Sequence, residues 1–258
     1  MTLSEDELRK RLERDMMFYE SADAQLKTLK PEKHSTAFYT LGRNAQAVAV
    51  DYLLLDDVES ATAWFQKTSC AYSMSVVKAR EFFDVLPAKT SIKESEPGRC
   101  EQALNTAVLS GDDDTLSKAI SVTLGLGNNY PKEVKPPIPN YYYAMSLAFF
   151  LTCEPDRAFG YAQSIKRGDR PYEPYFEGIN ASLSGLIKSD RVMMLDGLRT
   201  LLLSHSRIFG RDLDSEGLVC FPASSLVKLA RKRGMNIGPE DFEEKYRKYI
   251  PWSLFDYA

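Results

Sequence analysis

Very short acidic turns between apolar segments constrain the fold of this chain more than any other feature of its sequence. Such turns stand at Asp56-Asp57, at Asp112 to Asp114, at Glu154 to Asp156 and at Ser189-Asp190. A connection of about two to five residues makes the two helices that it joins run antiparallel and side by side. Where the flanking segments are helical, the sequence therefore predicts helical hairpins.

The flanking segments do have helical spacing. After a capping box at Ser4 to Glu7, the apolar residues Leu8, Leu12, Met16 and Tyr19 recur every three or four positions. No convincing run of alternating β-branched residues predicts a strand. Helices are expected at about 5–30, 36–55, 58–86, 100–109, 115–126, 141–152, from Pro155 onward, and at 173–188, 190–207, 222–233 and 239–249, with Asn140 as an N-cap and a polar loop at 88–98.

The spacing of the turns predicts how the hairpins are arranged. The turns near residues 112, 155 and 190 follow one another at intervals of about 35 to 45 residues, the range of stacked helical-hairpin repeats. The Trp, Gly, Tyr and Pro pattern of a true tetratricopeptide repeat is missing. We predict an all-α fold, an irregular α-solenoid or repeat-like stack of antiparallel helical hairpins. It would form a single domain over 1–258, with a subdivision into 1–87 and 98–258 as the alternative.

The aspartate run at Asp112 to Asp114 raises the question of a metal site. An aspartate at the start of a helix accepts hydrogen bonds from free N–H groups and complements the helix dipole. A calcium loop needs further oxygen ligands at alternate positions, and Leu116, Lys118 and Ala119 supply none. The sequence predicts a capped turn here and no metal.

Composition and charge exclude several classes of partner. Hydrophobic residues make up 44% and charged residues 27% of the chain, as in soluble globular proteins. The net charge of −3 is spread over interspersed residues and argues against direct binding to nucleic acid. The opening MTLSEDELRK lacks the apolar run of a secretory signal, and no segment is apolar enough to span a membrane. We expect a cytoplasmic protein without a membrane partner.

The four cysteines are widely spaced and include no CxxC pair. Cys70, Cys100, Cys153 and Cys220 also have no histidine nearby that would complete a zinc site. Small buried hydrophobic residues in a reducing compartment explain them better than disulfides do.

No motif of catalysis or of cofactor binding stands out. His34 and His205 are the two histidines, and both lie near helix ends, where capping or a favourable interaction with the helix dipole explains them. The segment Gly125 to Gly127 lacks the strand and the Lys-Ser/Thr ending of a phosphate loop. We therefore expect no enzyme, no catalytic residue and no cofactor, with a helical hydrolase built from scattered carboxylates as an alternative.

Two stretches have the composition of binding surfaces. Tyr141 to Tyr143 occupy three successive helical positions, so at least one of the three should reach solvent, and Tyr172 and Tyr175 precede another helix. Tyrosine is favoured in protein interfaces, although tyrosines at the edge of a core look the same in sequence. The basic residues 228–234 are expected to close a helix with Gly234 as a left-handed cap, with nucleic-acid binding as the alternative.

The second half of the chain resembles a known family. Its order of elements is AMSLAFFLTCEPDRAFGYAQSI, then YFEGINASLSGLIKSDRVMMLDGLRTLLLSHSR, then VCFPASSLVKLARKRGMNI, and finally YIPWSLFD. Alternating helices with short acidic turns, an Ala-basic-basic-basic-Gly stop and a Tyr-x-Pro-x-x-Leu close make 141–256 similar to the bacterial immunity 49 family. The first half matches only as generic helices.

The resemblance implies a small cytoplasmic immunity protein that blocks a toxin by binding it, without catalysis. Such a partner is often basic, which suits a mildly acidic helical stack. On this hypothesis the toxin domain would contact Tyr142, Tyr172, Tyr175 and Asp113. The alternative is a tetratricopeptide-like adaptor that scaffolds other proteins.

Overall fold

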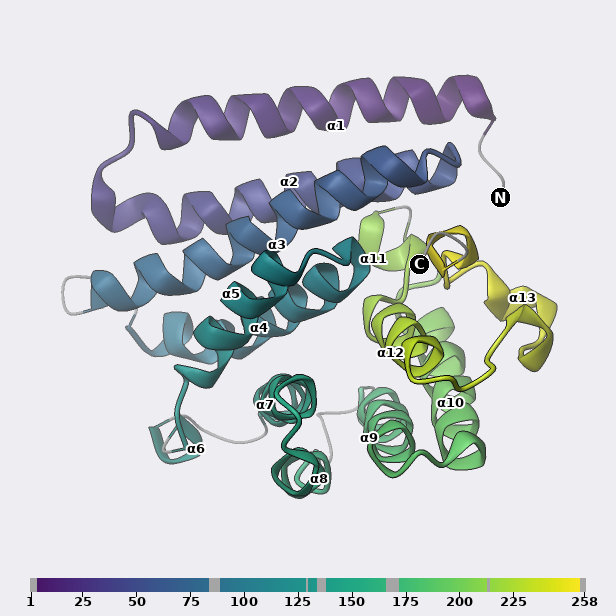
Figure 1. Cartoon of the computed structure of the whole chain (residues 1–258). Coiled ribbons are helices and arrows are strands. Elements are labelled where there is room, and N and C mark those ends of the chain that lie inside the picture. The colour runs from purple at the N-terminus through teal and green to yellow at the C-terminus, as the bar shows by residue number, and fades with distance from the viewer. Residues whose placement is uncertain are drawn as a thin grey trace. The chain divides into compact units, whose positions relative to one another are not determined.

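The structure, a computed structural model, describes residues 4–83, 89–128, 130–133, 138–165, 172–212 and 214–255 (Figure 1). These residues form α-helices and short 3-10 helices, and no strand occurs among them. The prediction of an all-α, repeat-like stack of antiparallel hairpins is confirmed. No helix within the described ranges is both long enough and apolar enough to cross a bilayer.

The chain divides into two compact units. Unit 1 consists of Met1–Val122 with Asp256–Ala258, and unit 2 consists of Thr123–Phe255. In unit 1, consecutive helices pack on one another, α1 on α2, α2 on α3 and α3 on α4. The elements of unit 1 are α1 (Glu5–Leu26), η1 (Pro31–Lys33), α2 (His34–Leu54), α3 (Val58–Glu81), α4 (Lys89–Ser110) and most of α5 (Asp113–Leu124).

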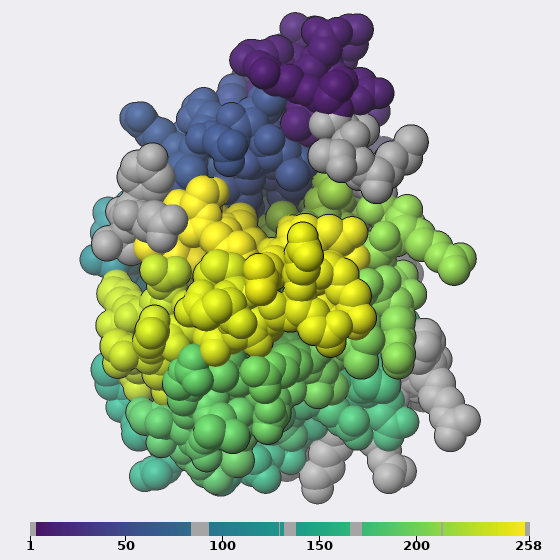
Figure 2. Space-filling view, turned by 90° about the vertical axis from the view of Figure 1, so that its right-hand side faces the viewer, coloured from purple at the N-terminus to yellow at the C-terminus, as the bar shows by residue number. Residues whose placement is uncertain are grey.

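Unit 2 is built around two hairpins and a C-terminal segment. Helix α7 packs on α8, and α9 packs on α10 along most of its length. Figure 2 shows the yellow C-terminal segment lying against the green helices of this unit. The elements are α6 (Tyr130–Glu133), α7 (Pro139–Leu151), α8 (Pro155–Ala162), α9 (Glu173–Lys188), α10 (Arg191–Ile208), α11 (Ser215–Leu218), α12 (Phe221–Lys232), η3 (Pro239–Asp241), α13 (Glu244–Arg247) and η4 (Trp252–Phe255).

The four short turns share one backbone conformation. In each turn, one residue has the left-handed conformation that ends a helix: Asp56 (φ 58°), Gly111 (φ 72°), Cys153 (φ 60°) and Ser189 (φ 56°). A single left-handed residue reverses the chain direction, so the next helix can start at once. The residue that follows is acidic in every case: Asp57, Asp112, Glu154 and Asp190.

Three of these acidic residues cap the next helix with a side-chain oxygen, as expected for the aspartate run. The cap satisfies one of the N–H groups that a helix start leaves without an intrahelical partner. Glu154 makes no such cap, and there Pro155 removes one of the free N–H groups instead. The caps are Ser60 N to Asp57 Oδ1 at 3.0 Å, Thr115 N to Asp112 Oδ2 at 2.8 Å and Met193 N to Asp190 Oδ1 at 3.0 Å.

The same acidic residues also close the helix that precedes them. Their backbone N–H groups donate to a carbonyl five residues earlier, which is the hydrogen bond of the Schellman motif. The turn at Gly111 differs, because there the N–H of Asp112 donates to Ser110 Oγ at 3.3 Å. The three Schellman bonds are Asp57 N to Tyr52 O at 2.9 Å, Glu154 N to Phe149 O at 2.9 Å and Asp190 N to Gly185 O at 2.8 Å.

One predicted loop is wrong. A polar loop is expected at 88–98, yet α4 already begins at Lys89, and residue 88 itself lies outside the described residues. The buried carboxylate of Glu96 lies 3.7 Å from Arg80 Nε on α3. Such contacts with α3 favour the helix despite the backbone hydrogen bond that Pro97 removes from its interior.

Two other local predictions are corrected at helix ends. Asn140 is not an N-cap, because α7 starts at Pro139, whose fixed φ suits the first helical position. The helix expected at 239–249 is broken into η3 and α13. Gly238 N donates to Asp241 Oδ2 at 3.1 Å and closes the first short turn, after which Phe242 has extended backbone angles.

The cysteines are all free, but only two of them are buried. Cys100 and Cys220 lie in the core as expected, whereas Cys70 and Cys153 are exposed. Cys153 occupies the left-handed position of a hairpin turn, where the backbone lies at the surface. The expectation of four buried thiols is therefore wrong for these two.

Small residues set the distance between α9 and α10. A Cβ atom on Gly178 would lie 2.5 Å from the backbone nitrogen of Leu201, so the two backbones touch there. Two more contacts of this kind follow, in which a glycine on one helix faces the backbone of the other: Gly197 with Ser182, and Gly185 with Met194. From one contact to the next, the chain advances by four and then three residues along α9 and goes back by the same numbers along α10, as in a coiled coil with antiparallel helices.

We predict that Gly197→Ala lowers the free energy of unfolding by about 1–3 kcal/mol, because the added methyl group overlaps backbone atoms of α9 that cannot move independently. Gly160→Ala is the matched control, since a Cβ on this exposed helical glycine meets nothing within 4 Å. The control should be neutral or up to about 1 kcal/mol more stable, because alanine favours the helix. Urea unfolding followed by circular dichroism measures both, and equal stability of the two variants would contradict the prediction.

The left-handed serine gives a second stability prediction. Ser189→Gly should raise the free energy of unfolding by about 0.5–1 kcal/mol. Glycine adopts a positive φ without the Cβ clash, and this gain exceeds the cost of its greater freedom in the unfolded chain. Ser189→Val should lower the free energy of unfolding, since a β-branched side chain is disfavoured at φ 56°. Thermal melts of the two variants would test this, and a valine variant at least as stable as the wild type would show that the turn is not under this constraint.

Candidate functional site

The described part of unit 2 contains an aromatic cluster around a buried histidine. We define the His205 cluster as Tyr172, Tyr175, His205, Phe209 and Tyr249. The imidazole lies 4.9 Å from the Tyr249 ring, 5.3 Å from the Phe209 ring and 6.5 Å from the Tyr175 ring, centroid to centroid. Phe209 is the C-cap of α10 and follows His205 by four residues, so the two rings lie on one side of the helix end. The cluster therefore joins the start of α9, the end of α10 and the C-terminal segment.

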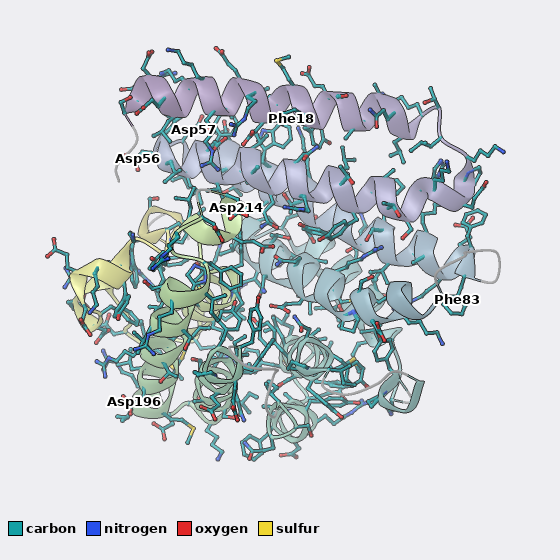
Figure 3. All side chains as sticks on the ribbon, turned by 180° about the vertical axis from the view of Figure 1, so that it is seen from behind. Phe18, Asp56, Asp57, Phe83, Asp196 and Asp214 are labelled. Carbon is teal, nitrogen blue, oxygen red and sulfur yellow. The ribbon has the colours of Figure 1, made fainter. Side chains whose placement is uncertain are left out.

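His205 is enclosed by the cluster and is neutral. The residue is 2% exposed, and neither ring nitrogen has a hydrogen-bond partner in the described chain. Burial lowers the pKa of His205 to about 4, against a small opposing effect of the Asp214 carboxylate (Figure 3). The expectation that a positive charge on His205 complements the helix dipole is therefore wrong, because burial outweighs the dipole.

Close backbone packing fixes the Tyr249 side of the cluster. Tyr249 O accepts from Cys220 N at 2.9 Å, and its hydroxyl contacts Ser206 Oγ at 3.2 Å. A Cβ atom at Gly210 would overlap the backbone oxygen of Ser206 and lie 2.6 Å from that hydroxyl, so the backbone contact requires glycine just after α10. These contacts hold the C-terminal segment against the end of α10.

The other side of the cluster reaches solvent. Tyr172 is 40% exposed and is one of the few large apolar or aromatic side chains in the described residues that remain so accessible. Its ring lies 6.3 Å from Phe209, which in turn lies 6.0 Å from Tyr175, and both of these residues are half-buried. The result is an aromatic rim of Tyr172, Tyr175 and Phe209 that rests on a rigid base.

Tyr142 belongs to a different cluster of unit 2. It packs 5.2 Å from Tyr141, which is fully buried and stacks on Tyr130 at 5.2 Å. The Tyr141 hydroxyl donates to Gly127 O at 2.9 Å, and burial raises the pKa of Tyr141. Of the three successive tyrosines, Tyr141 and Tyr143 are buried and Tyr142 is partly exposed, so the prediction that one reaches solvent is confirmed.

Asp113 lies in unit 1, in the exposed first turn of α5. The neighbouring Asp112 makes the cap, and hydrogen bonds from the side chain and then the backbone N–H of Thr115 lower the pKa of Asp112. Of the four residues expected at the partner surface, the structure thus brings together Tyr172 and Tyr175. Tyr142 lies in a separate cluster, and Asp113 lies in the other unit.

The arginines at the end of α12 contact aromatic rings of unit 2. The Arg233 guanidinium lies 4.0 Å from the centre of the Phe150 ring, and the Arg231 guanidinium lies 5.7 Å from that of Phe255. Burial lowers the pKa of Lys228 to about 8. Gly234 has φ 82° and so forms the predicted left-handed cap. The predicted helix end with its glycine cap is therefore confirmed.

Sequence reasoning identified two of the three rim residues and missed Phe209 and the base. The Tyr-x-x-Tyr pattern singles out Tyr172 and Tyr175, whereas Phe209 and Tyr249 come from segments with no unusual composition. The four-residue spacing of His205 and Phe209 is a weak signal that could have linked these two residues. No group of three or more metal-ligating side chains occurs among the residues that the structure describes.

Comparisons with known proteins add no family. No protein-family model matches the chain, no curated protein matches it, and no solved structure matches it.

The buried imidazole predicts a loss of stability in acid. The pKa of His205 is lowered, so the unfolded state binds a proton that the folded state does not, between about pH 6.5 and pH 4. From pH 6.5 to pH 5 the wild type should lose about 2 kcal/mol relative to His205→Phe, which cannot be protonated. Urea unfolding at both pH values measures the difference.

Asp214→Asn is the control for this comparison. It removes the nearby carboxylate but keeps the buried imidazole, so this variant should still lose free energy of unfolding between pH 6.5 and pH 5. If His205→Phe and the wild type lose the same stability on acidification, the imidazole is not the group that responds.

Proposed function

We propose that this chain is an immunity protein that neutralises a toxin by binding it directly, without catalysis. The observation that carries the proposal is the aromatic rim of Tyr172, Tyr175 and Phe209, which is partly exposed on a buried, rigid base. The resemblance of 141–256 to the immunity 49 family supports it, because the rim lies in that part of the chain. Neither a metal nor a cofactor enters the proposed role.

The physical case for the rim is its low entropic cost of binding. A tyrosine offers a large contact area with few rotatable bonds, and packing against neighbouring rings restricts those bonds further. Tyr172 faces solvent while its ring lies near Phe209, so binding would bury the ring without first ordering it. Such residues are typical of the hot spots that dominate protein interfaces.

An adaptor that scaffolds other proteins is the second candidate. Repeat-like antiparallel hairpins favour it, because stacked hairpins commonly present protein-binding surfaces. The two roles differ in one genetic respect. An immunity gene should be tolerated alone, whereas expression of its cognate neighbour should be toxic without it; an adaptor predicts no such toxicity.

Co-expression with the neighbouring gene product tests the role directly. We expect growth to be restored when both proteins are produced, together with a stoichiometric complex in native mass spectrometry. Several partners of unrelated mass, or a complex without any rescue of growth, would favour the adaptor.

A point substitution tests the surface. Tyr172→Ala should weaken binding of the purified toxin domain by about 10-fold or more, because hot-spot truncations cost more than about 1.4 kcal/mol. Stability should change little, since the side chain is 40% exposed. Val192→Ala is the matched control, because Val192 is an exposed apolar residue of the same unit at the far end of α10. Titration calorimetry measures both, and equal affinities would remove Tyr172 from the interface.

A further inference from the structure

Helix α1 is held to unit 1 with little apolar burial. Of its 22 residues, only Leu8 and Asp15 are buried, whereas ten of the 21 residues of α2 are. Met17 and Phe18 of this helix are 68% and 56% exposed, and Figure 3 labels Phe18 on α1. Leu8 is the one buried apolar residue of α1, and Leu12, Met16 and Tyr19 are only half-buried, so the polar contacts of α1 carry a larger share of its docking energy.

A charged cluster stands at the centre of the contact between α1 and α2. Arg11 Nε lies 2.7 Å from Asp51 Oδ1 of α2 and 3.8 Å from Asp15 Oδ2, and Arg14 Nε lies 2.9 Å from Asp15 Oδ1. The Arg11–Asp51 contact is an ion pair, and neither carboxylate oxygen of Asp51 accepts a hydrogen bond from the described residues. Asp51 is thus a buried carboxylate that depends on the charge of its neighbours.

The buried charges of this cluster do not balance. The side chains of Asp15 and Asp51 are 9% and 0% exposed. Of the two arginines that contact them, Arg11 is the buried one, with 9% of its side chain exposed. Arg14 is 59% exposed, so water screens its charge. Two ionised carboxylates beside one buried guanidinium leave an excess negative charge inside the contact, which is costly in a low dielectric.

The acidic groups that follow the C-terminal end of α2 are exposed to solvent. Asp56 and Asp57 lie in the turn between α2 and α3 (Figure 3), and these two and Glu59 are exposed. The part of α3 next in sequence contributes the buried apolar residues Ala61 and Phe65 to the core. The charges that act on Asp51 most strongly therefore come from α1: Arg11, Arg14 and Asp15.

We propose that α1 is a pH-sensitive strap, whose hold on α2 tightens when Asp51 takes up a proton and loosens when Asp51 gives it up. The proton removes the excess negative charge and lets the Asp51 carboxyl group donate a hydrogen bond to the Asp15 carboxylate. Loss of the proton restores the repulsion in a contact that has little apolar burial to resist it.

The direction of the response follows from proton linkage. Burial, opposed by Arg11 and reinforced by Asp15, raises the pKa of Asp51 from 3.8 to about 7. With α1 detached, the carboxyl group meets water and recovers an ordinary pKa, so the docked state binds the extra proton between about pH 4 and pH 7. Docking is therefore strongest below about pH 4, weakens as the pH rises from 4 to 7, and levels off above pH 7.

The second half of α1 has contacts that do not titrate near neutral pH and would remain in place during loosening. Tyr19 packs edge-on against Trp64 of α3 at 4.7 Å, and Asn44 Nδ2 donates to Phe18 O at 3.0 Å. Detachment should accordingly begin at the N-terminal half of α1, where the charged cluster lies.

Amide hydrogen exchange of the full chain tests the proposal. After correction for the intrinsic exchange rate, the opening equilibrium of α1 around residues 8–15 should rise about 10-fold between pH 6 and pH 8, as expected for one group that titrates near pH 7. Exchange of α3 amides serves as the internal reference. Asp51→Asn should abolish the rise, because an amide cannot ionise.

Two further measurements keep the test decisive. Asp23→Asn is the matched control, since it removes an exposed α1 carboxylate that pairs with Lys27, and the 10-fold rise should remain. Should Asp51→Asn fail to fold, a carboxyl carbon NMR titration of the wild type replaces it, and one aspartate titrating near pH 7 is expected. A flat pH profile of α1 exchange, a rise that persists in Asp51→Asn, or no aspartate titrating above pH 6 would overturn the proposal.

Discussion

The joint between consecutive helices is the constraint on which the rest of the structure depends. One residue with positive φ ends a helix, and the acidic residue after it starts the next. At Asp57 and Asp190, a single residue closes the old helix with its N–H group and caps the new one with its side chain. A joint this short leaves the two helices no freedom to separate, so their facing sides must fit each other in size and charge.

The contacts between neighbouring helices are filled by different residues. In the α9–α10 pair, which such a joint connects, glycines bring the backbones together. Where α1 meets α2, which a longer connection joins, charged groups lie at the centre of the contact and Leu8 is the one buried apolar residue of α1. Both units bury an ionisable group. Burial favours the neutral form in each case, so it lowers the pKa of His205 and raises the pKa of Asp51.

Most of the architecture could be predicted, because hairpins follow from local signals. Acidic caps and apolar periodicity placed α9 at the observed residues and α10 to within a residue or two. The left-handed residues were hidden, since three of the four are Asp, Cys or Ser and not glycine. The start of α4 and the break near Phe242 were missed because tertiary contacts and a local turn outweighed propensity there. The rim tyrosines carried a composition signal, whereas the buried base of the cluster depends on contacts between distant segments.

The matched steps of α9 and α10 limit how this hairpin can change in length. An extra residue in the turn at Ser189 would rotate one helix by about 100° relative to the other. Side chains would then stand where Gly178, Gly185 and Gly197 now allow backbone contact. The exposed turn should consequently tolerate an insertion or deletion less well than surface loops usually do.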